Sequence, residues 1–196
     1  MASNVPALEE LTLLPGSHRT REEGVCALEA VAWLANEPHS DRPACVSPVI
    51  AQFVRTWNDQ LPTDEERNRL LLPILPRLIG TVSGQASVED RRAWMSADWL
   101  IREHTPAWLD LAKLTEHATA LRSLPEMTKP ADIEPAMIDI RAAARAAAGG
   151  AARAAAWDAA RAAAGVAARA ALRRPTIAAL QDSALRLIDR MIAVGS

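Results

Sequence analysis

Apolar residues recur at intervals of three or four along most of this chain, the spacing that places them on one face of an α-helix. The first such stretch carries Val25, Leu28, Val31 and Leu34. Later stretches carry Ile50, Phe53, Val54, Trp57 and Leu61, and finally Ile177, Leu180, Leu185, Ile188 and Ile192. No alternating β-strand pattern bounded by turn residues is present. The pattern predicts an all-α fold, a multi-helix bundle of about seven to nine helices.

Cap residues and prolines mark the expected helix boundaries. Thr20-Arg21-Glu22-Glu23 and Thr63-Asp64-Glu65-Glu66 have the form of capping boxes, in which side chains satisfy the first free amides of a helix. Ser47-Pro48 places a cap residue before a proline in the first turn. We therefore expect helices to begin at these three points. The first of them should end before Pro38, because the residue preceding a proline disfavours helical geometry.

Four regions follow from these boundaries. Residues 1–19 contain two prolines and a glycine, which indicates a loosely ordered N-terminal arm. Residues 20–124 form an acidic helical body that holds five of the six tryptophans, and residues 125–135 form a Pro-rich connector. Residues 136–196 should comprise an Ala/Arg-rich helix, or two helices, and a final amphipathic helix packed on the body. We expect the break before that final helix at Pro175.

The segment from Arg141 to Arg174 is almost entirely alanine and arginine, both strong helix formers. Most of its large residues are four or eight positions apart, and each four-residue step advances about 40° around a helix of 3.6 residues per turn. The arginines therefore spiral around the axis and do not form one basic face. A helix that follows nucleic-acid phosphates would keep its cations on one side, so the pattern argues against nucleic acid as a partner.

Charge is divided unevenly along the chain. Residues 1–140 hold 13 Lys and Arg against 21 Asp and Glu, a net charge of −8. Residues 141–174 hold seven Arg against one Asp, a net charge of +6. This asymmetry favours packing of the Ala-rich helix on the acidic body, on a second copy or on a protein partner. The expected packing residues are Arg141, Arg145, Arg153, Trp157, Arg161, Arg169 and Arg173.

Composition and charge bear on the size of the core, on membrane insertion and on the cellular compartment. The 196-residue chain is long enough to bury a core, and tryptophan supplies nearly all of its aromatic bulk. We expect no membrane span, because no stretch of 18 residues lacks charge. The N-terminus has no basic region followed by a hydrophobic one, so we expect a cytoplasmic protein. Its two cysteines should then be free thiols.

One group of residues could carry chemistry. Cys26, His39 and Cys45 lie within twenty residues that also contain Glu29 and Glu37. Thiolate and imidazole are zinc ligands, so the three could hold Zn²⁺ if the chain folds back on itself, although the spacing matches no standard zinc finger. Alternatively Cys26 is a buried core residue. A nucleophile pair of Cys45 with His39 as base is a further alternative.

The chain has no glycine-rich phosphate loop, no G-x-S-x-G, no H-E-x-x-H and no paired CxxC motif.

Three stretches of the sequence resemble alanine-rich hypothetical proteins of actinobacteria and their phages. They are Glu29-Ala-Val-Ala-Trp-Leu-Ala-Asn-Glu-Pro-His-Ser-Asp41, Pro43-Ala-Cys-Val-Ser-Pro48, and Ala97-Asp-Trp-Leu-Ile-Arg102 with Thr105-Pro-Ala-Trp-Leu109. The resemblance covers most of residues 20–195. It implies a helical body before an Ala/Arg tract, and it implies no activity, cofactor or catalytic residue.

The leading hypothesis is a non-enzymatic, all-helical interaction or scaffold protein of bacterial or phage origin, without a cofactor. Two alternatives stay open. One is a small metal-dependent or thiol-dependent enzyme centred on Cys26, His39 and Cys45. The other is a nucleic-acid-binding protein that uses the arginine-rich helix.

Overall fold

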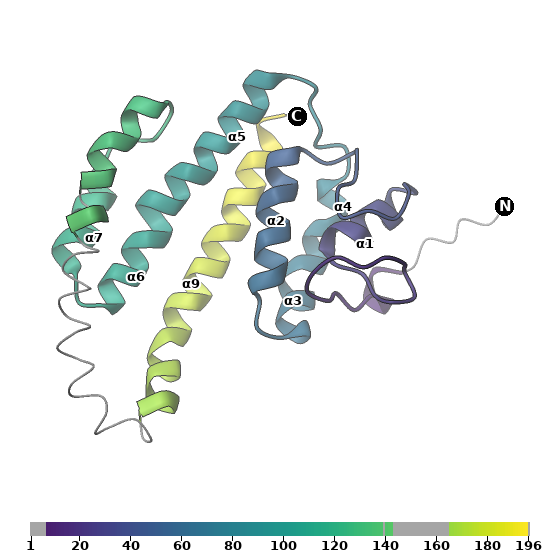
Figure 1. The fold of residues 1–196 in the computed structure, drawn as a ribbon, viewed down its shortest axis with the longest axis horizontal. Helices are drawn as coiled ribbons and strands as arrows, with labels where there is room; N and C mark the ends of the chain where they lie inside the picture. Colours follow the sequence, from purple (N-terminus) through teal and green to yellow (C-terminus); the bar gives the residue numbers. More distant parts are fainter. Residues whose placement is uncertain (1–6, 139, 143–164, 196) are drawn as a thin grey trace. The chain divides into compact units, whose positions relative to one another are not determined.

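The computed structural model describes residues 7–138, 140–142 and 165–195, and these residues are predominantly helical. Figure 1 shows the helices along the chain, with no strand among the described residues. The all-α prediction is therefore confirmed. The elements are η1 (Leu8–Glu10), α1 (Ala27–Leu34), α2 (Pro48–Gln60), α3 (Asp64–Leu71), η2 (Leu72–Ile74), α4 (Leu75–Leu78), α5 (Ala86–Trp99), η3 (Leu100–His104), α6 (Thr105–Leu111), α7 (Thr115–Ser123), η4 (Pro130–Asp132) and α9 (Gly165–Ala193). Residues 133–138 and 140–142 are also helical.

The chain divides into two compact units. Unit 1 comprises Met1–Ala93 and Ile188–Ser196, and unit 2 comprises Trp94–Leu187. The divisions fall within α5 and α9. None of the described helices combines the length and apolar character needed to cross a membrane.

The helix starts of unit 1 include two that the sequence predicted. The Ser47 hydroxyl accepts a hydrogen bond from the Ile50 amide at the start of α2, and Pro48 occupies the first turn. The Thr63 hydroxyl accepts from the Glu66 amide at the start of α3. Behind these caps, α1 packs against α2 and α4. The enclosed core is aliphatic, with fully buried side chains that include Leu28, Val31, Ile50, Val54, Leu71, Leu75 and Leu78.

The first long helix begins later than expected. Residues 21–23 form only a turn, and α1 begins at Ala27 with Cys26 as its N-cap. Gly24 lies between them with a φ of +140°, a backbone conformation that ends any helix started at Thr20. Glu29 supplies the capping carboxylate, which accepts a hydrogen bond of 2.8 Å from the Cys26 amide. The capping box at Thr20 was therefore a wrong prediction.

Residues 7–19 of the expected N-terminal arm are mostly exposed, but two of their leucines are buried. Leu13 is fully buried, and Leu11 is 6% exposed. Leu13 also forms an isolated parallel β-bridge with Val25, and the Leu14 amide donates to the Val25 carbonyl. The expectation rested on the prolines and glycine, which indicate loss of helix but say nothing about long-range burial.

Unit 2 contains α6 and α7, which pack against each other, and η3, a π-helical segment that continues α5. The chain turns between α6 and α7, where Lys113 adopts a φ of +62°. The unit's core cluster contains Ile101, Leu121, Met127 and Ala136, with Trp94, Leu109, Leu124 and Ile140 packed against it.

One further expectation differs from the structure. Helix α9 continues through Pro175, which was expected to separate two helices. A proline removes one backbone hydrogen bond, but buried residues such as Leu187 and Met191 stabilise later turns of the helix. Tryptophan contributes little to the core. Among the tryptophans that the structure describes, Trp99 alone is buried, and the interior is filled mainly by Leu, Ile, Val and Ala.

Candidate functional site

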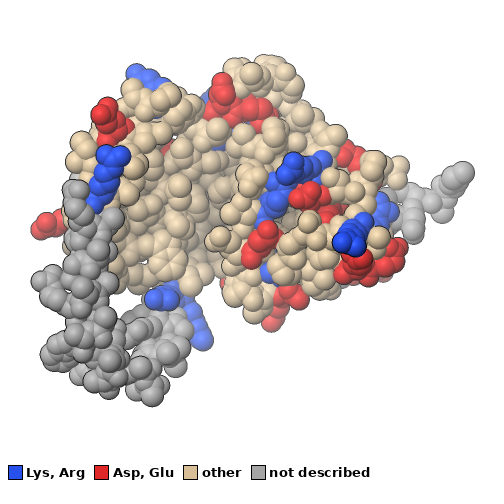
Figure 2. Space-filling model, viewed as in Figure 1, with Lys and Arg blue, Asp and Glu red and all other residues tan. Residues whose placement is uncertain are grey.

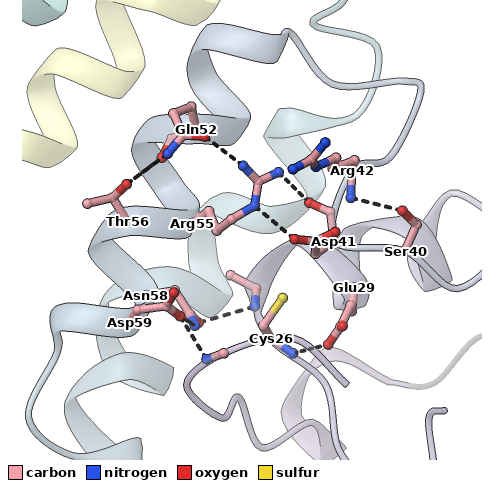
Figure 3. Close-up of polar contacts among 12 residues, drawn as sticks. Cys26, Glu29, Ser40, Asp41, Arg42, Gln52, Arg55, Thr56, Asn58 and Asp59 are labelled. Carbon is pink, nitrogen blue, oxygen red and sulfur yellow. Dashed lines mark hydrogen bonds and ion pairs between the residues drawn. The ribbon is translucent and has the colours of Figure 1, made fainter. Parts of the chain in front are cut away.

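A buried carboxylate, Glu29, organises the most connected polar site in unit 1. Its side chain is 1% exposed and lies on the first turn of α1. One oxygen accepts from the His18 amide at 2.6 Å, and the other accepts from the Cys26 amide at 2.8 Å. Figure 3 shows the Glu29 carboxylate directed back at the Cys26 backbone. The carboxylate therefore joins the N-terminal segment to the start of α1.

Two histidines surround this carboxylate. His18 Nδ1 lies 2.8 Å from Glu29 Oε2, and His39 Nε2 lies 3.8 Å from Glu29 Oε1. His39 Nε2 also lies 3.1 Å from the His18 carbonyl oxygen. Burial by itself raises the pKa of Glu29, but hydrogen bonds from the His18 and Cys26 amides and from the His18 ring bring that pKa below its ordinary value. Glu29 is thus held as an anion.

The His18 ring is enclosed on the side away from Glu29. A Cβ atom built on Gly24 would lie 3.1 Å from His18 Nε2 and 2.6 Å from Leu14 Cδ1. The second ring nitrogen therefore packs against the Gly24 backbone. A general base needs its free nitrogen within reach of a substrate proton, so this geometry favours a structural role for His18.

The three candidate zinc ligands occupy different positions around this site. Cys26 is the buried N-cap of α1, and burial raises the pKa of its thiol to about 12. Cys45 is partly exposed, and its amide donates to Glu37 Oε1 at 2.9 Å. Burial and the neighbouring Glu37 carboxylate also raise the pKa of Cys45. His39 lies beside Glu29.

No three or more His, Cys, Asp or Glu side chains in the described part of the chain are arranged to hold a metal ion. Cys26, His39 and Cys45 all belong to that part. Zinc binding by them stays a prediction, and it would require rearrangement of the side chains. Both thiols also favour the protonated form, whereas a zinc ligand or a nucleophile must be a thiolate.

A second polar group, missed from the sequence, also contacts the N-terminal segment. Asn58 is fully buried on α2, and its amide bonds the Leu14 carbonyl and the Ala27 amide. Arg67 on α3 is 2% exposed and donates to the carbonyls of Asn58 and Leu61 at 2.8 Å. Each residue lies one helical turn from buried leucines or valines, and this periodicity is the signal that could have located them.

A third set of buried polar contacts ties the two ends of unit 1. Arg92 is fully buried and donates to the carbonyls of Thr81 at 2.7 Å and Met191 at 2.8 Å. Its guanidinium also pairs with Glu89, which accepts from the Ser47 hydroxyl. These bonds compensate the cost of burying the Arg92 charge, so a role in stability accounts for this group of contacts.

Four of the seven expected packing residues of the arginine tract lie outside the described residues, namely Arg145, Arg153, Trp157 and Arg161. Arg169 falls within α9. The structure describes the remaining two, Arg141 and Arg173, as exposed.

Basic and acidic side chains are interspersed on the visible face in Figure 2. In unit 1, Arg55 lies 3.1 Å from Asp41, and Figure 3 shows this pair between α2 and the preceding loop. Arg77 pairs with Asp189 at 2.7 Å in the same unit. These contacts pair side chains of opposite charge.

Comparisons with known proteins give no relative. The chain matches no family model, no curated protein and no solved structure.

Proposed function

We propose that the protein is a non-enzymatic helical interaction protein. The proposal rests on the most connected polar site. Both oxygens of the Glu29 carboxylate accept hydrogen bonds from His18 and Cys26 of the chain itself. A carboxylate whose two oxygens accept these bonds joins segments of the fold. The site supports stability, so the activity of the protein is expected at its surface.

The proposed interacting segment is the Ala/Arg-rich stretch of residues 141–174. Its net charge of +6 complements the −8 of residues 1–140. Alanine allows close approach of another helix, and arginine side chains can cover apolar surface while they pair with acids. The first partner to test is a second copy of the chain, because each copy carries both the basic segment and the net-acidic residues 1–140.

Unit 2 offers apolar side chains for such a contact. Leu100 is 50% exposed, Trp108 is 37% exposed and Ile138 is 64% exposed. Trp108 is also held in place, because its Nε1 donates to His104 Nε2 at 3.2 Å. Tryptophan is among the residues that contribute most to protein interfaces.

The test compares full-length chains in which Arg145, Arg153, Arg161 and Arg169 are all replaced by Gln or all by Lys. Sedimentation velocity gives the mass over a wide protein concentration range, and calorimetry gives the Tm. The Gln variant is expected to associate less and to melt at a lower temperature, whereas the charge-preserving Lys variant should stay close to the wild type. Identical mass and identical Tm in all three proteins would contradict the proposal.

Nucleic acid and catalysis are distinguished by separate measurements. Association that depends on nucleic acid would disappear after nuclease treatment, and a gel shift at low salt would then favour the nucleic-acid alternative. The enzyme alternative requires a reactive thiol or a bound metal, so thiol labelling and metal analysis test it.

A further inference from the structure

The N-terminal segment of unit 1 is bound through its backbone by side chains of α2 and α3. The Leu13 amide donates to Asn68 Oδ1 at 2.8 Å, and the Gly16 amide donates to Asp59 Oδ1 at 2.8 Å. The Leu14 carbonyl accepts from Asn58 Nδ2 at 3.0 Å. We call Asn58, Asp59, Arg67 and Asn68 the backbone clamp, since Arg67 Nη1 also reaches the Leu13 carbonyl at 3.5 Å.

Two leucines anchor the same segment. Leu13 has no exposed surface, and Leu11, two residues earlier, is 6% exposed. Leu11 has extended backbone angles, with φ −82° and ψ 136°. Side-chain bonds to backbone amides and carbonyls, combined with apolar sites for alternate residues, are the features by which proteins bind extended peptides.

These contacts do not depend on the covalent connection. The clamp bonds join residues 43 to 55 positions apart in the sequence. The connection to α1 passes through residues 19–23, where Arg19, Thr20, Glu22 and Glu23 are exposed. This short exposed stretch can act as a hinge, while His18 on its N-terminal side bonds Glu29 on the other.

We propose that the backbone clamp is a binding site for an extended, leucine-containing peptide segment, and that residues 7–18 of a second copy can occupy it in place of the chain's own. The exchanged segment would make every contact that it makes within its own chain, including the bonds from His18 to Glu29. Exchange of an identical element costs little at equilibrium for this reason. This proposal uses none of residues 141–174, so the two proposals can fail independently.

The first experiment cuts the hinge. A protease recognition sequence is inserted after Thr20 in the full-length chain, and cleavage leaves the segment held by noncovalent contacts only. A fluorescent peptide of residues 7–19 is then added. The cut protein is expected to raise the anisotropy of this peptide, and unlabelled peptide should compete.

Two controls make this result specific. The uncut protein should bind the labelled peptide far more slowly, because its own segment stays tethered at high effective concentration. A peptide with Leu13→Asp should bind at least about a hundredfold more weakly, since burial of a leucine is lost and a charge must be buried. Failure of the cut protein to take up the labelled peptide, or equal uptake of the Leu13→Asp peptide, would overturn the proposal.

The second experiment shortens the hinge. Deletion of residues 20–22 leaves too little chain for the segment to return to its own clamp, so light scattering should report a doubled mass. Adding Leu13→Asp to the deletion should restore the monomer mass. A monomer that keeps hydrogen-exchange protection at Leu13 and Leu14 would contradict exchange. If the deletion prevents folding, the cut-hinge experiment decides alone.

Discussion

His18 and Glu29 are joined twice, by a backbone amide bond of 2.6 Å and by a ring contact of 2.8 Å. The pair ties a segment that precedes α1 to the first turn of α1. It also satisfies a carboxylate that is 1% exposed. Removing one partner of a buried ion pair leaves the other charge buried and unpaired, which destabilises the fold. Substitutions of this pair should therefore lower the free energy of unfolding.

Glu29→Gln is expected to destabilise the protein by about 2–3 kcal/mol, because hydrogen bonds to a charged group contribute roughly 1.5–3 kcal/mol. Gln can also accept at only one side-chain atom, whereas both Glu29 oxygens are bonded. Urea unfolding measures the change. Glu65→Gln is the matched control, since Glu65 is exposed on α3. Equal free energies of unfolding for the two variants would show that the buried bonds do not stabilise the fold.

The same carboxylate should make stability depend on pH. The pKa of Glu29 lies below its ordinary value of 4.5 in the folded protein. Its contribution is therefore fully present above the unfolded pKa and is lost as the pH falls through the folded pKa. The difference in unfolding free energy between wild type and Glu29→Gln should shrink as the pH falls below about 4.5. A difference that grows below that pH would contradict the direction of the shift.

Helix starts in unit 1 were predictable where the signal is local. Ser47 and Thr63 cap helices because a hydroxyl beside a first turn can reach an amide two or three residues on. The start of α1 was not predictable in this way, because Gly24 ends the earlier turn and Cys26 is not a typical cap. Pro175 likewise predicted the end of a helix from local sequence, but α9 continues through it because buried residues stabilise later turns of the helix.

The candidate site was located only in part. The sequence directed attention to Cys26 and His39, and the structure brings both beside Glu29. It gave no reason to include His18, because the packing of the N-terminal segment depends on contacts with α2 and α3 that are distant in sequence. Asn58 was accessible in principle, since it follows Val54 by one helical turn on the buried face.

Gly24→Ala tests the close packing behind His18. Alanine at this position would require a strained φ of +140°, and its Cβ would lie 2.6 Å from Leu14 Cδ1. We expect a loss of about 2–4 kcal/mol, because strained backbone alone costs roughly 1–3 kcal/mol and the contact adds to it.

Gly84→Ala is the matched control, with a φ of +64° and open space around the new Cβ. It should cost only about 1–2 kcal/mol, the penalty of the left-handed conformation. Denaturant unfolding of both variants gives the comparison. The contact behind His18 would be excluded as a constraint if Gly84→Ala proved the more damaging change.

The two thiols should differ in reactivity. Cys26 is 2% exposed with a thiol pKa of about 12, whereas Cys45 is partly exposed. Because the thiolate is the reacting form, iodoacetamide should modify Cys45 first, and Cys26 should react only as the fold opens. Intact mass against time measures the two steps, and Cys45→Ser identifies the first. Rapid labelling of Cys26 in the folded Cys45→Ser protein would reopen the thiol-enzyme alternative.

Metal analysis provides the sharpest test of the zinc hypothesis. Zinc binding by Cys26, His39 and Cys45 would require deprotonation of two thiols whose pKa values are raised and release of the contacts that His39 makes. We therefore expect protein purified without a His tag to contain less than about a tenth of a zinc ion per chain, and its Tm to be unchanged by a chelator. One zinc per chain, lost together with several degrees of Tm on chelation, would support the metal site instead. Cys45→Ser should then abolish the zinc content, while Glu65→Gln should leave it intact.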